Sequence, residues 1–278
     1  MLQQSGLKRD TVDKFYTSKN AVDTCINLIK ENIDFSKNDL CIEPSAGNGA
    51  FLPQITTLSD NCKFYDIEPE NKQVVKQDYL ELDTNLLNLQ QYNKIHVIGN
   101  PPFGRQSSMA IKFIKKSTQY ADTISFILPK SFKKDSLQKK FPLNFHLICE
   151  HDIPEYSFII NDKKYNVPCV FQIWTKQNVP RKTPEILLPK NYSFTTKLNS
   201  PDISFRRVGV NSGDIENNPS VIQTKSDQSH YFIKFKEKIS NEFYQQLKLI
   251  EYPTKNNTVG PKSISKQELI KEFNKLTT

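Results

Sequence analysis

The 278-residue sequence predicts an α/β fold built on a mostly parallel sheet. Short apolar runs, such as residues 40–42, 95–98 and 123–128, alternate with helical patterns, as expected of strands that are covered on both faces. Two of these runs end directly in loops that combine polar residues with glycine or proline. Because open α/β sheets bind ligands at the carboxyl ends of their strands, these loops are the first place to look for a site.

The N-terminal segment predicts an arm followed by a helix. Residues 1–12 are polar, and we expect a flexible arm there. Thr17, Ser18 or Asn20 can cap the helix, because apolar side chains recur at i, i+3 and i+4 spacings between Ala21 and Ile29. The free backbone N–H groups at its start could bind the carboxylate of a small ligand, although an ordinary cap explains the residues equally well.

The first predicted strand, residues 40–42, opens into a loop with two closely spaced glycines, Gly47 and Gly49. A strand, a glycine loop and an apolar helix start are the arrangement of a nucleoside or dinucleotide site, because glycine lets the backbone approach a ligand. The G-x-G-x-x-G pattern and a phosphate-binding Lys-Ser/Thr are missing, so a nucleoside without a pyrophosphate fits better. Glu43 is then available to the ligand's amino group or charge.

Acidic residues follow the next two predicted strands. Asp66 ends the strand of residues 62–65, at the position where such folds hold a ribose diol, about 20 residues after the glycine loop. Glu68 is instead interpreted as a helix-start or surface acid. After residues 74–77, Asp78 could accept a hydrogen bond from an adenine amine and Tyr79 could cover the ring, although a turn cap explains Asp78 equally well.

The strand of residues 95–98 leads into Asn100-Pro101-Pro102-Phe103. The two prolines fix their own φ angles and remove two backbone donors, so the neighbouring carbonyls are held without ladder partners. An amide oxygen, a fixed carbonyl and an aromatic face then point into one space that suits a planar exocyclic amine. Two acceptors take its N–H groups while Phe103 stacks on the ring. The simpler interpretation is a proline turn that closes the strand.

The following residues complete the sheet. We expect a helix at 109–117, strands at 123–128 and 145–149, a short basic helix around 135–141, a hairpin over 156–167 that turns at Asn161-Asp162, and a last strand at 170–174. Four side chains superficially resemble a metal cluster, namely His146, Cys149, His151 and Asp152. Alternation along a strand sends them to opposite faces, so no metal site is predicted.

Beyond three prolines between residues 180 and 189 the chain becomes basic. Residues 181–278 carry 16 basic and 10 acidic side chains, a net charge of +6, which leaves +2 of the total +8 for residues 1–180. This favours a polyanionic partner. Strands are expected at 204–208 and 231–236, and helices at 240–250 and from Ser265, whose spacing to Glu268 is a capping box. Two interpretations of Arg206 and Arg207 stay open: they contact phosphates, or they simply lie on a solvated strand.

The five cysteines are scattered and never form a C-x-x-C pair, which favours reduced thiols in an intracellular compartment, cytoplasmic or nucleoid and nuclear. No signal peptide and no apolar stretch of membrane-spanning length is recognised, so no membrane partner is expected. We predict three parts: an arm at 1–12, a catalytic domain at 13–179, and a basic region for target recognition at 180–278.

Four features stand in one order along the chain: the aromatic-Thr stretch, the glycine loop with Glu43 and Phe51, the second-strand acid, and Asn-Pro-Pro-Phe. In this order they resemble the S-adenosylmethionine-dependent amino-methyltransferases, particularly the gamma class of DNA adenine-N6 methyltransferases, over residues 13–176. The resemblance implies a Rossmann-like seven-stranded methyltransferase fold, with a mostly parallel sheet, an antiparallel last strand and a small C-terminal α+β extension.

The resemblance also implies roles for individual residues. S-adenosylmethionine would be the cofactor, with its methionine end at Tyr16 and Thr17 and its ribose at Asp66. The other residues expected along it are Glu43, Ala46, Gly47, Gly49, Asp78, Tyr79 and Asn100. The catalytic loop would be Asn100, Pro101, Pro102 and Phe103. A second aromatic would sandwich the flipped base opposite Phe103; Phe158 fits best, with Tyr156 as the substitute.

The implied reaction is methylation of the exocyclic N6 amine of adenine in nucleic acid, with DNA as the favoured substrate and base flipping into the Asn-Pro-Pro-Phe pocket. Structured RNA is the main alternative. Relatives with Asn-Pro-Pro-Tyr methylate glutamine in proteins, and a methyltransferase-like subunit that binds nucleic acid without catalysis also stays open. Because the basic region is short for target recognition, a protein partner could assist.

Overall fold

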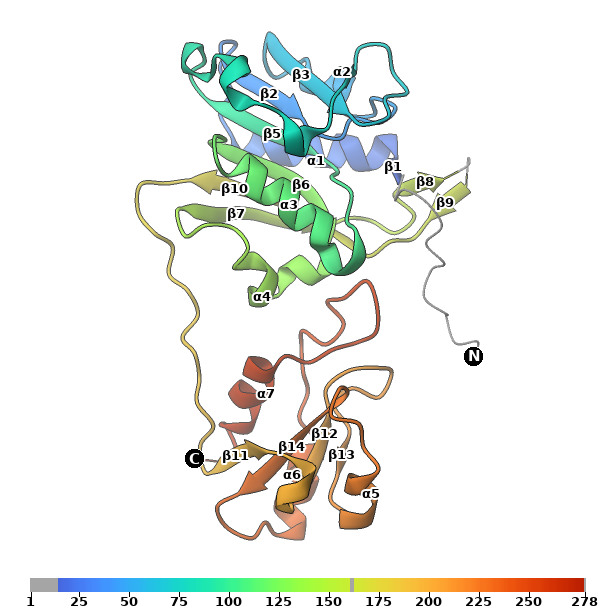
Figure 1. The fold of residues 1–278 in the computed structure, drawn as a ribbon, viewed down its shortest axis with the longest axis vertical. Helices are drawn as coiled ribbons and strands as arrows, with labels where there is room; N and C mark the ends of the chain where they lie inside the picture. Colours follow the sequence, from blue (N-terminus) through green and yellow to red (C-terminus); the bar gives the residue numbers. More distant parts are fainter. Residues whose placement is uncertain (1–14, 161–162, 278) are drawn as a thin grey trace. The chain divides into compact units, whose positions relative to one another are not determined.

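The computed structural model describes residues 15–160 and 163–277. The chain divides between Lys182 and Thr183, within the segment that contains the three prolines between residues 180 and 189, into an N-terminal unit and a C-terminal unit (Figure 1). The predicted arm, residues 1–12, lies outside the described residues. Within the described ranges, no helix is long and apolar enough to cross a membrane.

The N-terminal unit contains a seven-stranded sheet in the order β4-β3-β2-β5-β6-β10-β7. Its strands are β2 (Leu40–Glu43), β3 (Asn61–Asp66), β4 (Val75–Lys76), β5 (Ile95–Gly99), β6 (Thr123–Pro129), β7 (Phe145–Asp152) and β10 (Cys169–Lys176). Strand β10 runs antiparallel to both of its neighbours, and the pairs from β4 to β6 are parallel. The predicted seven-stranded methyltransferase fold is therefore confirmed.

The register of the central strands decides where the loops meet. Ile42 in β2 is the partner of Val97 in β5, and Glu43 is the partner of Phe64 in β3. The carboxyl ends of these three parallel strands consequently lie side by side. The glycine loop, the second-strand acid and the Asn-Pro-Pro-Phe loop therefore open at the same edge of the sheet.

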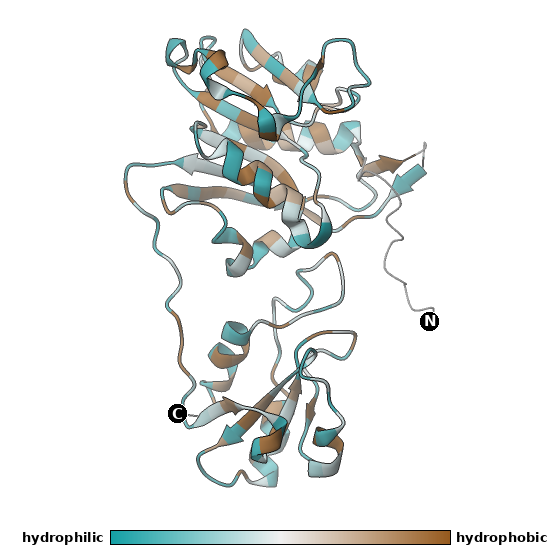
Figure 2. Cartoon of the chain, in the orientation of Figure 1, coloured by the Kyte–Doolittle hydropathy of each residue, from teal (hydrophilic) through white to brown (hydrophobic). Residues whose placement is uncertain are grey.

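Helices cover both faces of this sheet (Figure 1). They are α1 (Lys19–Asn32), α2 (Leu52–Ile55), α3 (Ser108–Ser117) and α4 (Asp135–Gln138), with 3₁₀ turns η1 (Tyr79–Glu81), η2 (Thr84–Leu87), η3 (Leu89–Gln91), η4 (Arg105–Ser107) and η5 (Lys130–Lys133). Helix α1 begins after Ser18, whose hydroxyl accepts from the N–H of Ala21, as predicted. Figure 2 shows hydrophobic residues gathered in the central strands.

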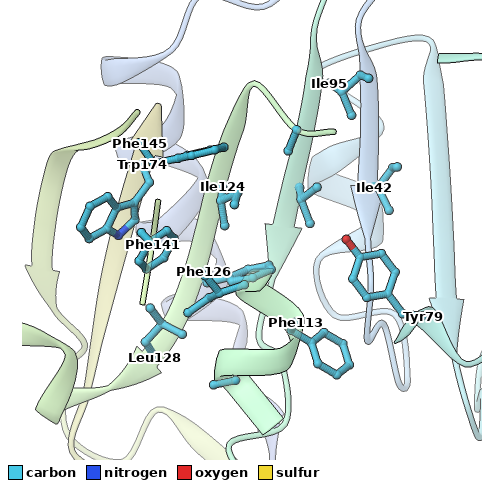
Figure 3. Packing of buried hydrophobic residues seen from close by; sticks show 14 of the residues in the cluster. Ile42, Tyr79, Ile95, Phe113, Ile124, Phe126, Leu128, Phe141, Phe145 and Trp174 are labelled. Atoms are coloured by element: carbon cyan, nitrogen blue, oxygen red, sulfur yellow. The ribbon is translucent and has the colours of Figure 1, made fainter. Parts of the chain in front are cut away.

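Helix α3 packs against the sheet in an apolar core that also contains Ile42, Val97, Ile124 and Phe126. Figure 3 shows this core, where Trp174 of β10 stacks on Phe141 at a centroid distance of 4.0 Å. The core fixes the strands from which the loops project. The loops therefore project from a closely packed, rigid part of the structure.

A second, three-stranded sheet has the order β1-β8-β9, with β1 (Tyr16–Thr17), β8 (Phe158–Ile160) and β9 (Lys163–Tyr165). Strands β8 and β9 form the predicted hairpin, whose turn at 161–162 lies outside the described residues. In the antiparallel pairing of β1 with β8, Thr17 is the partner of Phe158. The segment before α1 is thereby joined to the hairpin.

The C-terminal unit has an antiparallel sheet in the order β11-β14-β12-β13, formed by β11 (Tyr192–Thr195), β12 (Ile203–Arg206), β13 (Ile215–Glu216) and β14 (His230–Phe235). Its helices are α5 (Pro219–Gln223), α6 (Asn241–Lys248) and α7 (Lys266–Phe273), with one 3₁₀ turn, η6 (Lys197–Asn199). The hydroxyl of Ser265 accepts from the N–H of Glu268 at 3.1 Å, as the capping box predicted. Strands β11 and β13 and helix α5 were not predicted.

Candidate active site

A cavity opens at the carboxyl ends of β2, β3 and β5, with an empty volume of about 950 Å³ that includes its mouth. Its described lining comes from the loops after these strands and after β4, from β1 and from α3. The sequence-predicted residues that line it are Tyr16, Thr17, Glu43, Ala46, Gly47, Asp66, Asp78, Tyr79, Asn100 and Pro102. Residues predicted from five separate stretches of sequence thus meet in one cavity.

Asp66 ties the glycine loop to the end of β3. One oxygen of its carboxylate accepts the N–H of Gly47 at 2.7 Å, and the other accepts the N–H of Glu68 at 2.8 Å. Each carboxylate oxygen has two lone pairs, so both can accept a further hydrogen bond from a ligand. The geometry is compatible with the predicted contact to a ribose diol while giving Asp66 a structural role as well.

The two glycines of the loop have different tasks. Gly47 (φ +51°) lines the cavity, and a Cβ there would lie 3.5 Å from Cε1 of Tyr16. Gly49 (φ +83°) does not belong to the described lining; its N–H closes the turn onto the carbonyl of Ala46 at 2.7 Å. A Cβ on Gly49 would come within 2.6 Å of Nδ2 of Asn71. Gly49 therefore shapes the turn rather than the cavity wall.

Glu43 ends β2 with its side chain only 2% exposed. Its Oε2 has no hydrogen-bond partner among the described residues. Burial, and to a smaller extent the charge of Asp66, raise the pKa of this carboxyl to about 8. Gly99 makes room for it, because a Cβ at Gly99 would lie 3.2 Å from Cγ of Glu43. This carboxyl is therefore largely protonated at neutral pH, and a positive charge beside it would favour its ionisation.

Asn100 has one end of its amide fixed and the other free. Its Nδ2 donates to the carbonyl of Phe15 and to Oγ1 of Thr17, both at 3.2 Å. Because a backbone carbonyl can only accept, the amide nitrogen must point to that side. Oδ1 is buried and has no hydrogen-bond partner among the described residues. The hydroxyl of Ser45 meanwhile donates to the backbone carbonyl of Asn100 at 3.1 Å.

The rest of the Asn-Pro-Pro-Phe loop is divided between cavity and core. Pro102 lines the cavity, whereas Pro101 and Phe103 are buried outside the described lining. The carbonyl of Phe103 accepts the N–H groups of Met109 and Ala110, which start helix α3. Stacking of Phe103 on a target base stays a prediction, since in this conformation its ring is only 9% exposed.

The two aromatic residues expected on the other side of the base differ in exposure. Phe158 is fully buried and packs edge-on against Phe15 at a centroid distance of 6.3 Å. Tyr156 is 56% exposed and has a left-handed backbone with φ +58°, which is uncommon outside glycine. Neither belongs to the described lining of the cavity. The preference for Phe158 over Tyr156 therefore finds no support, because only Tyr156 presents a free ring.

Asp78 and Tyr79 line the cavity and are also part of the framework. Asp78 caps η1 by accepting the N–H of Leu80 at 2.9 Å, so the turn-cap interpretation holds beside the binding one. The hydroxyl of Tyr79 bonds to those of Ser117 and Tyr120, and its ring stacks on Phe113 at 5.4 Å. Figure 3 shows Tyr79 beside Phe113. Burial raises the pKa of Tyr79 far above its ordinary value.

Sequence reasoning missed several cavity residues, because they carry no motif. The hydroxyl of Tyr16 donates to Glu70, which lies in the loop after β3. Gln77, Met109 and Phe15 also line the cavity. Of these residues, only Met109 had a signal in the sequence, because it starts the helical pattern after the Asn-Pro-Pro-Phe loop.

Within residues 15–160 and 163–277, no three His, Cys, Asp or Glu side chains are arranged to hold a metal ion. Two members of the superficial cluster have other partners. A ring nitrogen of His146 lies 2.8 Å from the carbonyl of Val179, and Asp152 pairs with Lys130 and Lys133. The charged side chains in the described lining of the cavity are mainly carboxylates.

These residues suit a cationic nucleoside. S-adenosylmethionine carries a sulfonium and an ammonium group, a ribose diol and an adenine amine. The site offers Glu43 with an unpartnered buried oxygen, Asp66 with free lone pairs, and Asp78 at the cavity wall. Together with the strand order and the antiparallel β10, they are the arrangement expected of a class I methyltransferase fold, for which S-adenosylmethionine is the expected cofactor.

The chain is similar in sequence to known methyltransferases. It is 25% identical over 163 residues to the ribosomal RNA small subunit methyltransferase A of Mycoplasma mycoides. The match covers 52% of this chain and 61% of that protein. The protein of the same name from Francisella tularensis is 23% identical over 231 residues, covering 74% and 83% of the two chains. The chain thus spans about three fifths of the first relative. No protein-family model matches the sequence.

Among solved structures, the chain is similar to one from Listeria monocytogenes described as a class I S-adenosylmethionine-dependent methyltransferase. The TM-score is 0.45 at 17% identity, with 66% of this chain and 68% of that chain covered.

Proposed function

We propose that the chain transfers the methyl group of S-adenosylmethionine to the exocyclic N6 amine of adenine in RNA. The observation that carries this proposal is the amide of Asn100, whose Oδ1 is buried and unpartnered among the described residues while Nδ2 is held by two acceptors. A buried oxygen without a donor is costly, and an incoming N–H group would satisfy it.

The chemistry follows from what an acceptor does to an aromatic amine. The nitrogen lone pair is delocalised into the ring, so the free amine is a poor nucleophile. Oδ1 of Asn100 would accept one N–H of the amine and stabilise the positive charge that develops on nitrogen as the carbon–nitrogen bond forms. As this bond forms, the bond between the methyl carbon and the sulfonium sulfur breaks and leaves a neutral thioether. The amine nitrogen then passes one N–H proton to solvent water. The cofactor, when bound, supplies the electrophilic methyl group on its sulfonium.

The carboxylates around the cavity would seat the cofactor. Asp66 and Asp78 would accept hydrogen bonds from its ribose hydroxyls and adenine amine, as the sequence resemblance implies. Glu43, whose pKa is raised to about 8, would lose its proton when a cationic ligand lies beside it. Holding donor and acceptor in reacting geometry lowers the barrier further.

RNA replaces DNA as the favoured substrate in this proposal. The motif order from Tyr16 to Phe103 is common to enzymes for both nucleic acids, so it does not choose between them. The relatives named as ribosomal RNA methyltransferases favour RNA. A target adenine must leave its stack to reach the cavity, and the exposed ring of Tyr156 could stack on it.

Transfer of tritium-labelled methyl groups tests the proposal. The full chain is incubated with labelled S-adenosylmethionine and, separately, with ribosomal RNA, single-stranded DNA and duplex DNA, and the products are digested to nucleosides. We expect label in N6-methylated adenosine from RNA. Asn100→Ala should lower the rate about a hundredfold or more, the usual effect of removing one preorganised polar group.

Asn85→Ala is the matched control, because Asn85 is exposed in the same unit and lies outside the described lining of the cavity. It should transfer methyl groups at the rate of the unmodified chain. Label that appears only in DNA, or only in protein, would refute the proposal of RNA methylation.

A further inference from the structure

The C-terminal unit gathers basic residues from distant parts of its sequence. Val208 and Ser263 form an isolated antiparallel bridge, flanked by bonds from the N–H of Ile264 to the carbonyl of Arg207 at 2.8 Å and from the N–H of Gly209 to that of Lys262 at 2.9 Å. This pairing brings the end of β12 against the start of α7. Arg207 and Lys266 are thereby placed in one region.

Strand alternation separates the two arginines that the sequence could not distinguish. Arg206 is the partner of His230 in the β12–β14 pairing, and its Nε donates to the carbonyl of Val208 at 3.3 Å. Arg207, one residue on, belongs to the opposite face, where its guanidinium lies over the ring of Tyr231 at 5.4 Å. Arg206 therefore braces a turn, whereas Arg207 joins the aromatic side of the sheet.

Four residues form a continuous strip on that face, which we call the basic-aromatic strip: Arg207, Tyr231, Phe194 and Lys266. The rings of Tyr231 and Phe194 meet edge to face at 5.5 Å, and Nζ of Lys266 lies 4.0 Å from the centroid of Phe194. Both rings are partly exposed and Lys266 is exposed. Each ring thus holds one cation at the surface.

Neither cation of the strip is paired with a carboxylate among the described residues. Arg207 donates from Nη2 to the carbonyl of Gln228 at 2.6 Å, which leaves its other N–H groups available. Other cations of this unit behave differently: Lys197, Lys234 and Lys275 each lie within 4.0 Å of a carboxylate oxygen. Of two neighbouring carboxylates, Asp227 faces Lys197, and Glu268 accepts the N–H of Thr254 at Oε1 while its Oε2 is buried without a hydrogen-bond partner among the described residues.

We propose that the basic-aromatic strip binds two phosphates along the backbone of the RNA, an inference that rests on the proposed function for its choice of nucleic acid. The strip has two unneutralised cations that are separated by two rings in contact. A ligand with repeated anionic groups matches this arrangement better than a single phosphate does. The +6 charge of residues 181–278 favours the same ligand. The rings restrict the motion of both side chains, which lowers the entropy lost on binding.

Fluorescence anisotropy with a labelled single-stranded RNA tests the inference on the full chain, without cofactor and across a range of salt concentrations. The double variant Arg207→Ala with Lys266→Ala should bind about tenfold more weakly at moderate salt, because two phosphate contacts are lost. The slope of log affinity against log salt should become shallower by about 1.4, or about 0.7 for each contact.

Lys236→Ala with Lys238→Ala is the matched control, since it removes the same charge from two exposed positions of the same unit outside the strip. It should change affinity and slope much less. Arg207→Lys with Lys266→Arg keeps both charges and should retain the slope. Circular dichroism and cofactor titration of each variant report whether the fold is kept.

Unchanged RNA affinity in the strip variant would overturn the inference, and so would an equal loss in the control pair. A strip variant that binds RNA normally but loses affinity for polyglutamate would assign the strip to an acidic protein instead. Because anisotropy needs no methyl transfer, a chain that binds RNA through the strip and methylates none would refute only the proposed function.

Discussion

The hydroxyl oxygen of Thr17 lies 3.2 Å from Nδ2 of Asn100, although the two residues are 83 positions apart. Thr17 is also the partner of Phe158 in the pairing of β1 with β8. Strand β1 therefore connects the β8–β9 hairpin to the side-chain amide of Asn100 in the Asn-Pro-Pro-Phe loop. The direction in which Oδ1 of Asn100 points depends on this short strand as well as on the two prolines that follow Asn100.

Replacing Thr17 by valine should lower the rate of methyl transfer. The change keeps the shape of the side chain but leaves the amide of Asn100 with one acceptor, the carbonyl of Phe15. A hydrogen bond of this kind contributes about 1 kcal/mol, so we expect kcat to fall about fivefold. Steady-state transfer to RNA measures the change.

Thr17→Ser is the matched control, because serine restores the hydroxyl without the methyl group. It should recover most of the rate that valine loses. If valine and serine at this position gave the same kcat, the hydroxyl of Thr17 would have no part in orienting Asn100.

Asp66→Ala should weaken both the fold and cofactor binding. The substitution leaves the N–H groups of Gly47 and Glu68 without their acceptor, which we expect to cost about 1–3 kcal/mol of unfolding free energy. Cofactor affinity should fall at least about tenfold, since one charge-assisted contact is lost. Urea unfolding and isothermal titration measure the two effects.

Asp60→Ala provides the comparison. Asp60 also pairs with one neighbour, Lys37, at 3.2 Å, but both side chains are mostly exposed. Its removal should change the unfolding free energy by less than about 1 kcal/mol and leave cofactor affinity unaltered. A comparable loss of stability in both variants would contradict the structural role assigned to Asp66.

The main features of the fold could be predicted because burial leaves a pattern in the sequence. Strands β2 and β5 are covered on both faces, and their apolar runs at 40–42 and 95–98 are correspondingly continuous. The loops that follow them contain residues with restricted or special backbone angles, Gly47 and the two prolines. Since such residues have few other uses, the glycine loop and the Asn-Pro-Pro-Phe loop could be located from sequence.

Properties that depend on distant neighbours could not be predicted. The protonation of Glu43 depends on its burial and on the nearby Asp66, which follows another strand. The exposure of Tyr156 and the burial of Phe158 depend on β1, which packs against the hairpin from the other end of the domain. Helix α5 and strand β13 are too short to show any periodicity.

His96→Leu should destabilise the fold near the amino end of the central strand β5, at the end of the strand opposite the cavity. His96 is fully buried in β5, with one ring nitrogen 2.7 Å from Oγ1 of Thr123 and the other 3.1 Å from Oδ2 of Asp39. With leucine at this position, Oδ2 of the buried Asp39 would keep one hydrogen-bond partner, the N–H of Ser36. We expect a loss of about 1–3 kcal/mol in urea unfolding, because burial lowers the pKa of His96 and the lost contacts are hydrogen bonds of a neutral imidazole.

A double-mutant cycle with Asp39→Leu separates the pair from the packing. The double variant should recover part of the stability that His96→Leu loses, because no unpaired carboxylate then remains. Strictly additive losses would show that His96 and Asp39 stabilise the fold independently.

The carboxyl of Glu43 has a folded-state pKa of about 8, because burial and then Asp66 oppose its ionisation, against an ordinary value of 4.5. Between these two pH values the folded chain holds a proton that the unfolded chain has released. The unfolding free energy therefore falls as pH rises through this window, since the folded state binds more protons than the unfolded state.

Glu43→Gln should remove this part of the pH dependence. Glutamine stays neutral, so the variant should gain stability relative to the unmodified chain between pH 5 and pH 8, by up to a few kcal/mol. Urea unfolding without cofactor at several pH values measures the difference. Glu251→Gln, at an exposed position of the C-terminal unit, serves as the control and should leave the pH profile unchanged. Parallel profiles for the unmodified chain and Glu43→Gln would mean that Glu43 is ionised in the folded protein.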